Sequence, residues 1–469
     1  MGLLGLLALA QLMVILDISA VNVALPDLAA DLGLAGGGLG WAITSYSLVF
    51  GSLLLLGGRA ADLLGRRRVF LTGLGVFTVS SLVSALAGGA AVFFGARAGQ
   101  GLGAAMLSPA ALSIITTTFQ GPDRAKALGV WGAVGGAGAA IGVLLGGMLT
   151  ELVDWRAIFL VNLPVGVGVA IGALRAVPAD GARAQWRGLD LRGALVATAS
   201  LAALVYALSQ ATDAGWTSTQ TLGLGTSGLV GLTVFAALEL RTRKPLLNIA
   251  RLGDRAVGGG FLMMLTASAV LFGSFLLTSI YLQDVLGTGP LETGLAFLPI
   301  AVVIGAGSHI GSRLVGHAGP RVGMAVAFAL TAAGMLLLSG VDGDGTYVAD
   351  VLPGMLVSGF GLGVALVSVA LSVLTGAADD EAGMLSGLNT TGHEIGGSLG
   401  IAVLVTVATG AMGTASTSAS TAGLASGLGN AFLVAAGMSA VAGIVAPVVL
   451  PSAASFLPKL RLAPRVALH

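Results

Sequence analysis

The sequence lacks cysteine altogether and contains few charged or titratable side chains. Without cysteine, the chain can form neither disulfides nor thiolate metal sites, and it has no thiol nucleophile. Its four histidines are too few and too scattered to form a metal cluster, so we expect no metal and no cofactor. Charged residues make up 9% of the chain, against roughly 25% in an average soluble domain, which excludes an ordinary water-soluble fold. The net charge of +1 gives no indication of a nucleic-acid partner.

Motifs of the common enzyme classes are also missing. The sequence contains no HExxH metal motif, no Ser/His/Asp set and no pair of intramembrane aspartates of the kind that intramembrane proteases use. It contains no Walker lysine, so ATP is not expected to be the direct energy source. The glycine patterns fall within long apolar runs rather than in turns between a strand and a helix. We therefore expect that the protein is not an enzyme.

Long apolar runs dominate what is present. Hydrophobic residues form 56% of the chain, and we count fourteen runs of about the 20 residues that a helix needs to cross a bilayer. The runs do not alternate apolar and polar residues as the strands of a membrane barrel do. They predict an all-α membrane protein. The predicted spans are 3–25, 41–61, 69–87, 90–114, 125–149, 157–177, 189–210, 222–241, 256–279, 292–315, 321–340, 350–375, 382–411 and 429–451.

The loops between these runs differ sharply in charge. If the N-terminus lies inside, nearly all loop lysines and arginines fall on the inner side, and only Arg156 falls in an outer loop. Membrane proteins carry their excess of loop lysine and arginine on the cytoplasmic side. The asymmetry predicts an even number of spans with both termini cytoplasmic. Abundant alanine, glycine and arginine indicate a GC-rich bacterial genome, and therefore the inner membrane of a bacterium.

Two charged residues lie inside apolar runs. Asp17 stands in the first span, in LDISAVNVALP, and Arg97 stands in the fourth, in RAGQGLGAAMLSP. Both charges are costly in lipid unless they form a pair or serve a function. Burial penalises the charged form of a carboxyl group, so we expect Asp17 to take up and release protons. Arg97 is a plausible partner that would tune this proton exchange, although both residues could instead only hold helices together. Asn22 in the first span and Gln100, one helical turn after Arg97, are candidates to face the same cavity.

A third acid lies in the thirteenth span. Glu394, in NTTGHEIGGSLG, is a second candidate for proton coupling or for attracting a cation. His393 precedes it, and because adjacent residues of a helix point about 100° apart, both could reach a cavity only at its edges. Asn389 in the same span and His309 in the tenth span complete the cavity candidates. A structural role is the simpler interpretation of both histidines.

An acid and several arginines are crowded into the turn between the second and third spans. This stretch reads GRAADLLGRRR and begins at Gly58, with Gly65 before the first of the three arginines. Asp62 could pair with Arg66 or Arg67, or it could cap the N-terminus of a neighbouring helix. Such a contact would hold one conformation closed and break in another. The alternative is that the arginines serve only to orient the chain.

A faint echo of this turn occurs in the second half of the chain, where residues 312–321 read SRLVGHAGPR. The echo aligns Gly65 with Gly319 and Arg67 with Arg321. Paired halves around a central site are typical of secondary transporters. The predicted domains are an N-terminal six-helix bundle (1–178), two linker helices (179–250) and a C-terminal six-helix bundle (251–469).

Glycine is very abundant, with 75 residues, and the fifth span is especially rich in it. Gly142, Gly146 and Gly147 stand at the end of this span. Small residues let membrane helices approach closely and slide past each other. Static packing and a helix that rocks during transport are both open interpretations.

Together these motifs resemble the major facilitator superfamily, and more closely its fourteen-span drug:proton antiporter branch. GRAADLLGRRRV is similar to the family's loop motif between spans two and three, and LDISAVNVALP to the first-span signature. RAGQGLGAA resembles the fourth-span motif, whose arginine, here Arg97, is thought to serve proton transfer. WRAIFLVNLPVG and EAGMLSGLNTTGHEIGGSLGIA resemble segments of the sixth and thirteenth spans. In the fifth-span antiporter motif the usual Gly-Pro is Gly142-Val143 here, which leaves the direction of transport open.

The resemblance implies a major facilitator fold of two six-helix bundles plus two extra helices. It implies an alternating-access exporter that releases a hydrophobic or cationic drug or antibiotic while a proton enters. The expected partners are this small molecule, protons and the lipid bilayer, and a monomer is expected because family members usually act alone. Two alternatives remain: a proton-coupled importer of a small metabolite, and a membrane sensor that transports nothing.

Overall fold

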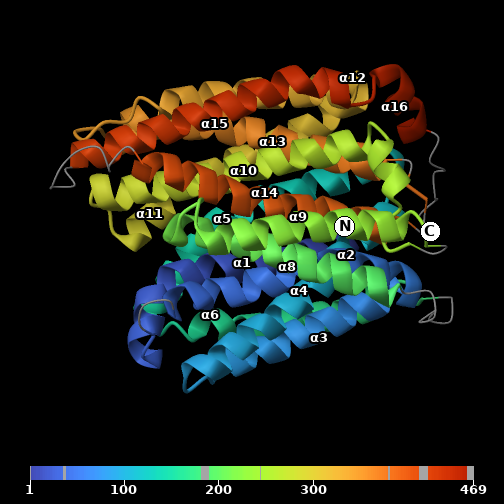
Figure 1. Ribbon diagram of the computed structural model, residues 1–469, viewed down its shortest axis with the longest axis horizontal. Coiled ribbons are helices and arrows are strands. Elements are labelled where there is room, and N and C mark those ends of the chain that lie inside the picture. Colours follow the sequence, from blue (N-terminus) through green and yellow to red (C-terminus); the bar gives the residue numbers. More distant parts are fainter. Residues whose placement is uncertain are drawn as a thin grey trace. The chain divides into compact units, whose positions relative to one another are not determined.

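The computed structural model describes residues 2–34, 38–180, 190–242, 245–375, 377–378, 381–410 and 421–461. All regular secondary structure in these ranges is helical. The α-helices are α1 (Gly2–Leu32), α2 (Gly38–Leu64), α3 (Arg66–Ala85), α4 (Ala90–Thr118), α5 (Gly121–Leu152), α6 (Ala157–Leu160), α7 (Asn162–Ala176), α8 (Leu191–Ala214), α9 (Thr219–Glu239), α10 (Val257–Ile280), α11 (Pro290–Ala296), α12 (Leu298–Leu338), α13 (Leu352–Leu374), α14 (Ala382–Gly410), α15 (Thr421–Val449) and α16 (Ala453–Arg461) (Figure 1). Short irregular helical turns are η2 (Ile249–Gly253), η3 (Tyr281–Val285) and η4 (Tyr347–Val351). The prediction of an all-α fold is therefore confirmed.

Twelve helical segments in the described part of the chain are long and apolar enough to cross a membrane. The predicted spans 292–315 and 321–340 fall together in one such segment, Leu291–Leu338. The predicted span 125–149 falls in the 32-residue helix α5. Within α5, only the segment Ile141–Leu152 is found as an apolar helix in the described residues, and it is shorter than the twelve candidate spans. The chain is a multi-span membrane protein, and the total of fourteen spans stays a prediction.

Two matching turns explain the echo in the sequence. Gly65 separates α2 from α3 with a φ of 106°, and Gly319 interrupts α12 with a φ of 83°. Only glycine adopts such a backbone readily, because a Cβ atom clashes there. Two residues after each glycine, an arginine side chain donates to a backbone carbonyl: Arg67 Nη2 to Leu174 O at 2.7 Å, and Arg321 Nε to Leu450 O at 2.8 Å. The echo thus corresponds to a repeated structural device.

The chain divides into two compact units. The first comprises Met1–Gln120, Gly142–Gly253 and Ala377–Thr391, and the second comprises Gly121–Ile141, Asp254–Gly376 and Gly392–His469. Helices α5 and α14 therefore contribute one part to each unit. The predicted domains 1–178, 179–250 and 251–469 stay a prediction.

Within the first unit, α4 packs against both α2 and α3, while α1 packs against α7. Glycine permits the close approach of α4 to its neighbours: a Cβ atom on Gly101 would lie 2.5 Å from Tyr46 O, and one on Gly103 would lie 2.5 Å from Phe77 N. Such small-residue contacts drive helix association where lipid offers no hydrophobic force. They bring the polar side chains of α3 and α4 within hydrogen-bonding distance of each other.

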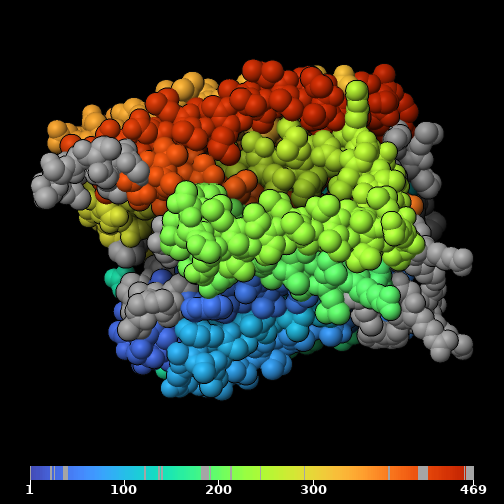
Figure 2. All heavy atoms as spheres, viewed as in Figure 1, coloured from blue at the N-terminus to red at the C-terminus, as the bar shows by residue number. Residues whose placement is uncertain are grey.

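Helices α8 and α9, which fall in the predicted linker region, pack against each other, and α8 also packs against α2. Helix α9 is exposed on the face seen in Figure 2, where its atoms form a continuous ridge. Its exposed side chains include Leu222, Leu229, Val230 and Val234. An apolar ridge of this kind is suited to lipid contact, because lipid tails solvate leucine and valine as well as a protein core does.

Candidate functional site

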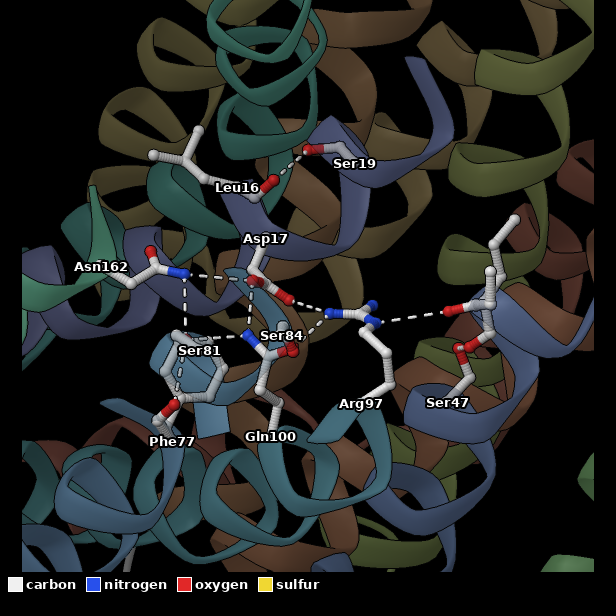
Figure 3. A network of polar contacts seen from close by, with 12 residues as sticks. Leu16, Asp17, Ser19, Ser47, Phe77, Ser81, Ser84, Arg97, Gln100 and Asn162 are labelled. Carbon is white, nitrogen blue, oxygen red and sulfur yellow. Dashed lines mark hydrogen bonds and ion pairs between the residues drawn. The ribbon is translucent and has the colours of Figure 1, made fainter. Parts of the chain in front are cut away.

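A buried ion pair joins α1 and α4 in the first unit. Arg97 Nη1 donates to Asp17 Oδ2, and each of the two residues is only 1% exposed (Figure 3). The sequence left open whether these residues meet, and the structure brings them into direct contact. A buried ion pair is costly to break, because removing one partner leaves the other charge without compensation.

Two neutral amides complete the shell of Asp17. Gln100 Nε2 donates to Asp17 Oδ1 at 2.7 Å, and Asn162 Nδ2 donates to the same oxygen at 3.0 Å. The carbonyl oxygen of Gln100 accepts from Arg97 Nη1 at 2.8 Å. Arg97 and Gln100 lie three residues apart on α4 and therefore share one face of it. Gln100 was predicted from this spacing.

Serine side chains of α3 support these amides. Ser81 Oγ accepts from Gln100 Nε2 at 2.8 Å and from Asn162 Nδ2 at 3.2 Å, and Ser84 Oγ donates to Gln100 Oε1 at 3.3 Å. The sequence did not predict a role for Ser81, Ser84 or Asn162. The only signal for Asn162 was its position in the segment that resembles a sixth-span signature.

Aromatic rings enclose the guanidinium group of Arg97. Its Cζ lies 4.5 Å from the ring centroid of Tyr46 and 5.8 Å from that of Phe159, and its Nε donates to Ala42 O at 3.3 Å. Phe159 also packs edge-to-face against Phe93 and belongs to a core cluster of buried residues. Cation–π contacts and a dry surrounding both strengthen the electrostatic interactions of the site.

The turn between α2 and α3 forms a second polar site. Asp62 Oδ1 accepts from Gly383 N at 2.8 Å, and Oδ2 accepts from Met384 N at 2.9 Å, so the carboxylate caps the N-terminus of α14. Arg66 Nη2 lies 3.7 Å from Asp62 Oδ1. Both contacts considered from the sequence are therefore present. A Cβ atom on Gly58 would lie 2.2 Å from Gly383 O, so α2 and α14 approach closely only because this residue is glycine.

The three arginines after Gly65 make different contacts. Arg66 Nε donates to Ser113 Oγ at 2.9 Å. The backbone N–H groups of Arg67 and Arg68 donate to the carboxylate of Asp180, at 3.2 and 3.0 Å, so Asp180 caps the N-terminus of α3. Such capping satisfies backbone donors that have no partner inside the helix. The role of Asp180 was not predicted, because it lies more than a hundred residues away in the sequence.

The fifth-span glycines allow α5 to approach α1 closely. A Cβ atom on Gly142 would lie 1.9 Å from Ser19 Oγ, and one on Gly146 would lie 2.7 Å from Ala20 Cα. Gly147 is also buried. Since Ser19 and Ala20 follow Asp17 on α1, this close contact places α5 beside the part of α1 that carries the buried acid. Static packing and rocking both remain compatible with it.

The remaining candidates are not joined to the Asp17 network by any described contact. In the second unit, His393 Nδ1 lies 3.3 Å from Glu394 Oε1, and Phe272 packs edge-to-face on His393 with centroids 5.1 Å apart. His309 is exposed. Asn389 is buried, and its Oδ1 has no hydrogen-bond partner in the described part of the chain. The side chain of Asn22 lies outside the described residues.

A buried ion pair inside a bundle of apolar helices is typical of membrane transporters. The family model of the Major Facilitator Superfamily matches residues 7–401. The chain therefore belongs to the major facilitator superfamily, which confirms the resemblance seen in its motifs.

Several relatives are similar over most of their length. The chain is 42% identical to the puromycin resistance protein pur8 of Streptomyces alboniger, covering 87% of this chain and 82% of that one. It is 40% identical to the cephamycin export protein CmcT of Amycolatopsis lactamdurans, covering 85% and 83%. It is 33% identical to a lincomycin resistance protein of Streptomyces lincolnensis, covering 86% and 83%.

Solved structures agree on the fold. The human organic anion transporter MFSD10 matches with a TM-score of 0.66 at 16% identity, covering 95% of this chain and 99% of that one. The proton:xylose symporter XylE matches with a TM-score of 0.64 at 14% identity, covering 98% of each chain. At this identity the likeness shows a major facilitator fold and nothing about the substrate.

Proposed function

We propose that this protein is a proton-coupled exporter of a hydrophobic or cationic antibiotic. The observation that carries the proposal is the buried pair of Asp17 and Arg97, because an intramembrane acid that pairs with a base is suited to proton exchange. The names of the relatives support export of antibiotics. The protein would act as a monomer without enzymatic activity, in the inner membrane of a bacterium, with both termini in the cytoplasm.

The proposed coupling follows from the charge of Asp17. While Asp17 is ionised, it holds Arg97 and two amides around itself and ties α1 to α4 and α7. Protonation removes the charge that these donors stabilise and so weakens the ties between the helices. Proton uptake would thus favour a different packing of α1. A conformational equilibrium shifts only if a ligand binds its two states differently, and the proton meets this condition here.

The turn between α2 and α3 would serve as the conformational switch. The Asp62 carboxylate stabilises the N-terminus of α14 through two backbone hydrogen bonds, and these bonds would break when α2 and α14 separate. Gly142 and Gly146 would let α1 shift against α5 without a steric barrier. In this proposal, residues 1–178 and 251–469 are the two six-helix bundles of the alternating-access cycle, and residues 179–250 link them.

Transport into inside-out membrane vesicles tests the proposal. The lumen of such a vesicle corresponds to the cell exterior, so an exporter driven by protons should accumulate puromycin or ethidium when the lumen is acidic. A protonophore should abolish this accumulation. A proton-coupled importer would instead deplete the probe from an acidic lumen, and a sensor would move neither probe nor protons.

Glu394 would attract the positive charge of a cationic substrate. Its side chain is only 21% exposed and its one described polar partner is His393, so it keeps capacity to accept from a ligand. We expect Glu394→Gln to raise the KM for ethidium about tenfold, since ~1.4 kcal/mol of lost binding corresponds to that factor. The KM for neutral chloramphenicol should change by less than about twofold, because that probe has no charge to lose.

The matched control for this prediction is Glu292→Gln. Glu292 is an exposed acid at the start of α11 that accepts a weak backbone hydrogen bond from Gly289 N, which glutamine can also accept. Its replacement should leave both KM values unchanged. Equal effects of Glu394→Gln on the cationic and the neutral probe would remove the proposed charge role.

A further inference from the structure

Asp17 and three polar side chains around it form a closed ring of hydrogen bonds. The nitrogen atoms Gln100 Nε2 and Asn162 Nδ2 each donate to two acceptors, Asp17 Oδ1 on one side and Ser81 Oγ on the other (Figure 3). All four residues are buried. The ring joins α1, α3, α4 and α7, so its geometry depends on the packing of four helices rather than on any single segment.

The hydroxyl of Ser81 fixes the direction of every bond in this ring. A serine hydroxyl has one hydrogen to donate, and Ser81 Oγ donates it to Phe77 O at 2.9 Å. Toward the ring, the oxygen can therefore only accept, which requires an NH2 group from each amide. Gln100 and Asn162 direct their NH2 groups to Ser81. They can therefore present only N–H donors to Asp17.

This direction matters because it distinguishes the two protonation states of Asp17. A carboxylate accepts hydrogen bonds from all of its donors, whereas a protonated carboxyl group also needs an acceptor for its own hydrogen. Hydrogen bonds made to the charged form therefore favour that form. Among the described residues, the charged and titratable groups packed around Asp17 are Arg97 from α4 and, over the guanidinium, Tyr46 from α2. Helices α3 and α7 contribute only neutral groups to the described contacts.

We propose that Asn162, oriented by Ser81, is a positioning residue that stabilises ionised Asp17 and thereby sets the pH at which the transporter takes up its proton. This inference rests on the proposed function and names a further determinant of its proton coupling. Asn162 acts independently of the ion pair, because its donor is neutral and comes from a helix that carries no charge into the site. Ser81 acts through Asn162 and Gln100 and does not contribute a charge either.

The test is Asn162→Leu, which removes the amide at similar side-chain size. The pH at which proton-driven ethidium transport is half-maximal should rise by about one unit. A hydrogen bond to a charged group contributes a free energy of roughly the size that shifts a protonation midpoint by one pH unit. The KM for ethidium at the pH optimum of each protein should stay within about twofold, since the residue does not bind substrate. A purely structural role would lower activity at every pH without moving the midpoint.

A second readout does not depend on transport. Infrared spectroscopy of the protein in lipid membranes follows the carbonyl band of a protonated carboxyl group, and the band that Asp17→Asn removes belongs to Asp17. The pH midpoint of this band should rise by about one unit in Asn162→Leu. An unchanged midpoint overturns the inference. If the wild-type protein transports none of the probes, the proposed function fails, and the infrared titration still decides the role of Asn162.

Ser81→Ala keeps the inference falsifiable if Asn162→Leu does not fold. Without the Ser81 oxygen the two amides lose their fixed orientation, so the midpoint should move in the same direction by a smaller amount. The matched control is Ser439→Ala, because Ser439 is also fully buried and also donates to a carbonyl four residues earlier, Ala435 O at 2.8 Å. Equal shifts in Ser81→Ala and Ser439→Ala would overturn the role of the ring.

Discussion

Replacing Asp17 with asparagine should reduce proton-driven efflux to the background of empty vesicles while leaving membrane insertion intact. Asparagine has nearly the same shape, but it cannot bind and release a proton at any pH that the cell reaches. The measurement is ethidium accumulation in inside-out vesicles with an acidic lumen. Exchange of labelled for unlabelled ethidium without a pH gradient should persist, because exchange moves substrate without net proton transfer.

The matched control is Asp123→Asn. Asp123 also pairs with a basic residue, Lys126 Nζ at 3.3 Å, but both of these side chains are exposed. An exposed pair contributes little to stability, so this variant should transport ethidium as the wild-type protein does. Full proton-driven accumulation by Asp17→Asn would refute Asp17 as the proton carrier.

Arg97→Met should both abolish proton-driven transport and destabilise the protein strongly. The methionine removes the positive charge that compensates Asp17 and leaves the carboxylate buried among neutral donors. Breaking a buried ion pair on one side typically costs about 3–5 kcal/mol. Chemical unfolding in detergent should show a loss of this size, and transport should fall to background. Arg156→Met is the control, because Arg156 and its partner Asp31 are about one-third or more exposed and their pair should contribute about 1 kcal/mol or less.

The double variant Asp17→Asn/Arg97→Met separates stability from function. It removes both charges, so no uncompensated charge remains in the protein interior, and much of the lost stability should return. Transport should not return, because the proton-binding carboxyl group is gone. A double variant as unstable as Arg97→Met alone would show that Arg97 stabilises the helices through its aromatic and backbone contacts rather than through Asp17.

The sequence located the charged members of the site more readily than the neutral ones. Asp17 and Arg97 are conspicuous because charge is rare in apolar runs, and Gln100 follows from the helical spacing on α4. Asn162 and Ser81 are ordinary polar residues in their own segments, and the sixth-span resemblance around Asn162 was the only signal for either. Their role became visible only where α3 and α7 pack against α1 and α4.

The turn between α2 and α3 shows the same limit. The stretch beginning at Gly58 predicted an acid that pairs with an arginine or caps a helix, and Asp62 does both. Its partner at the start of that helix, Gly383, lies 321 residues after it, and no local pattern could name this partner. Similarly, the glycine positions of the echo were visible in sequence, whereas the positive φ of Gly65 and Gly319 was not.

The amino-acid sequence by itself determined the membrane class, the helical architecture, the family and the two buried charges. These follow from composition, run length and local spacing, which are properties of neighbouring residues. The tertiary structure alone decided that Asp17 meets Arg97, that Ser81 orients the amides around it, and that α14 supplies the partner of Asp62. Contacts between distant segments depend on which helix faces meet, and hydropathy constrains those faces only weakly when almost every face is apolar.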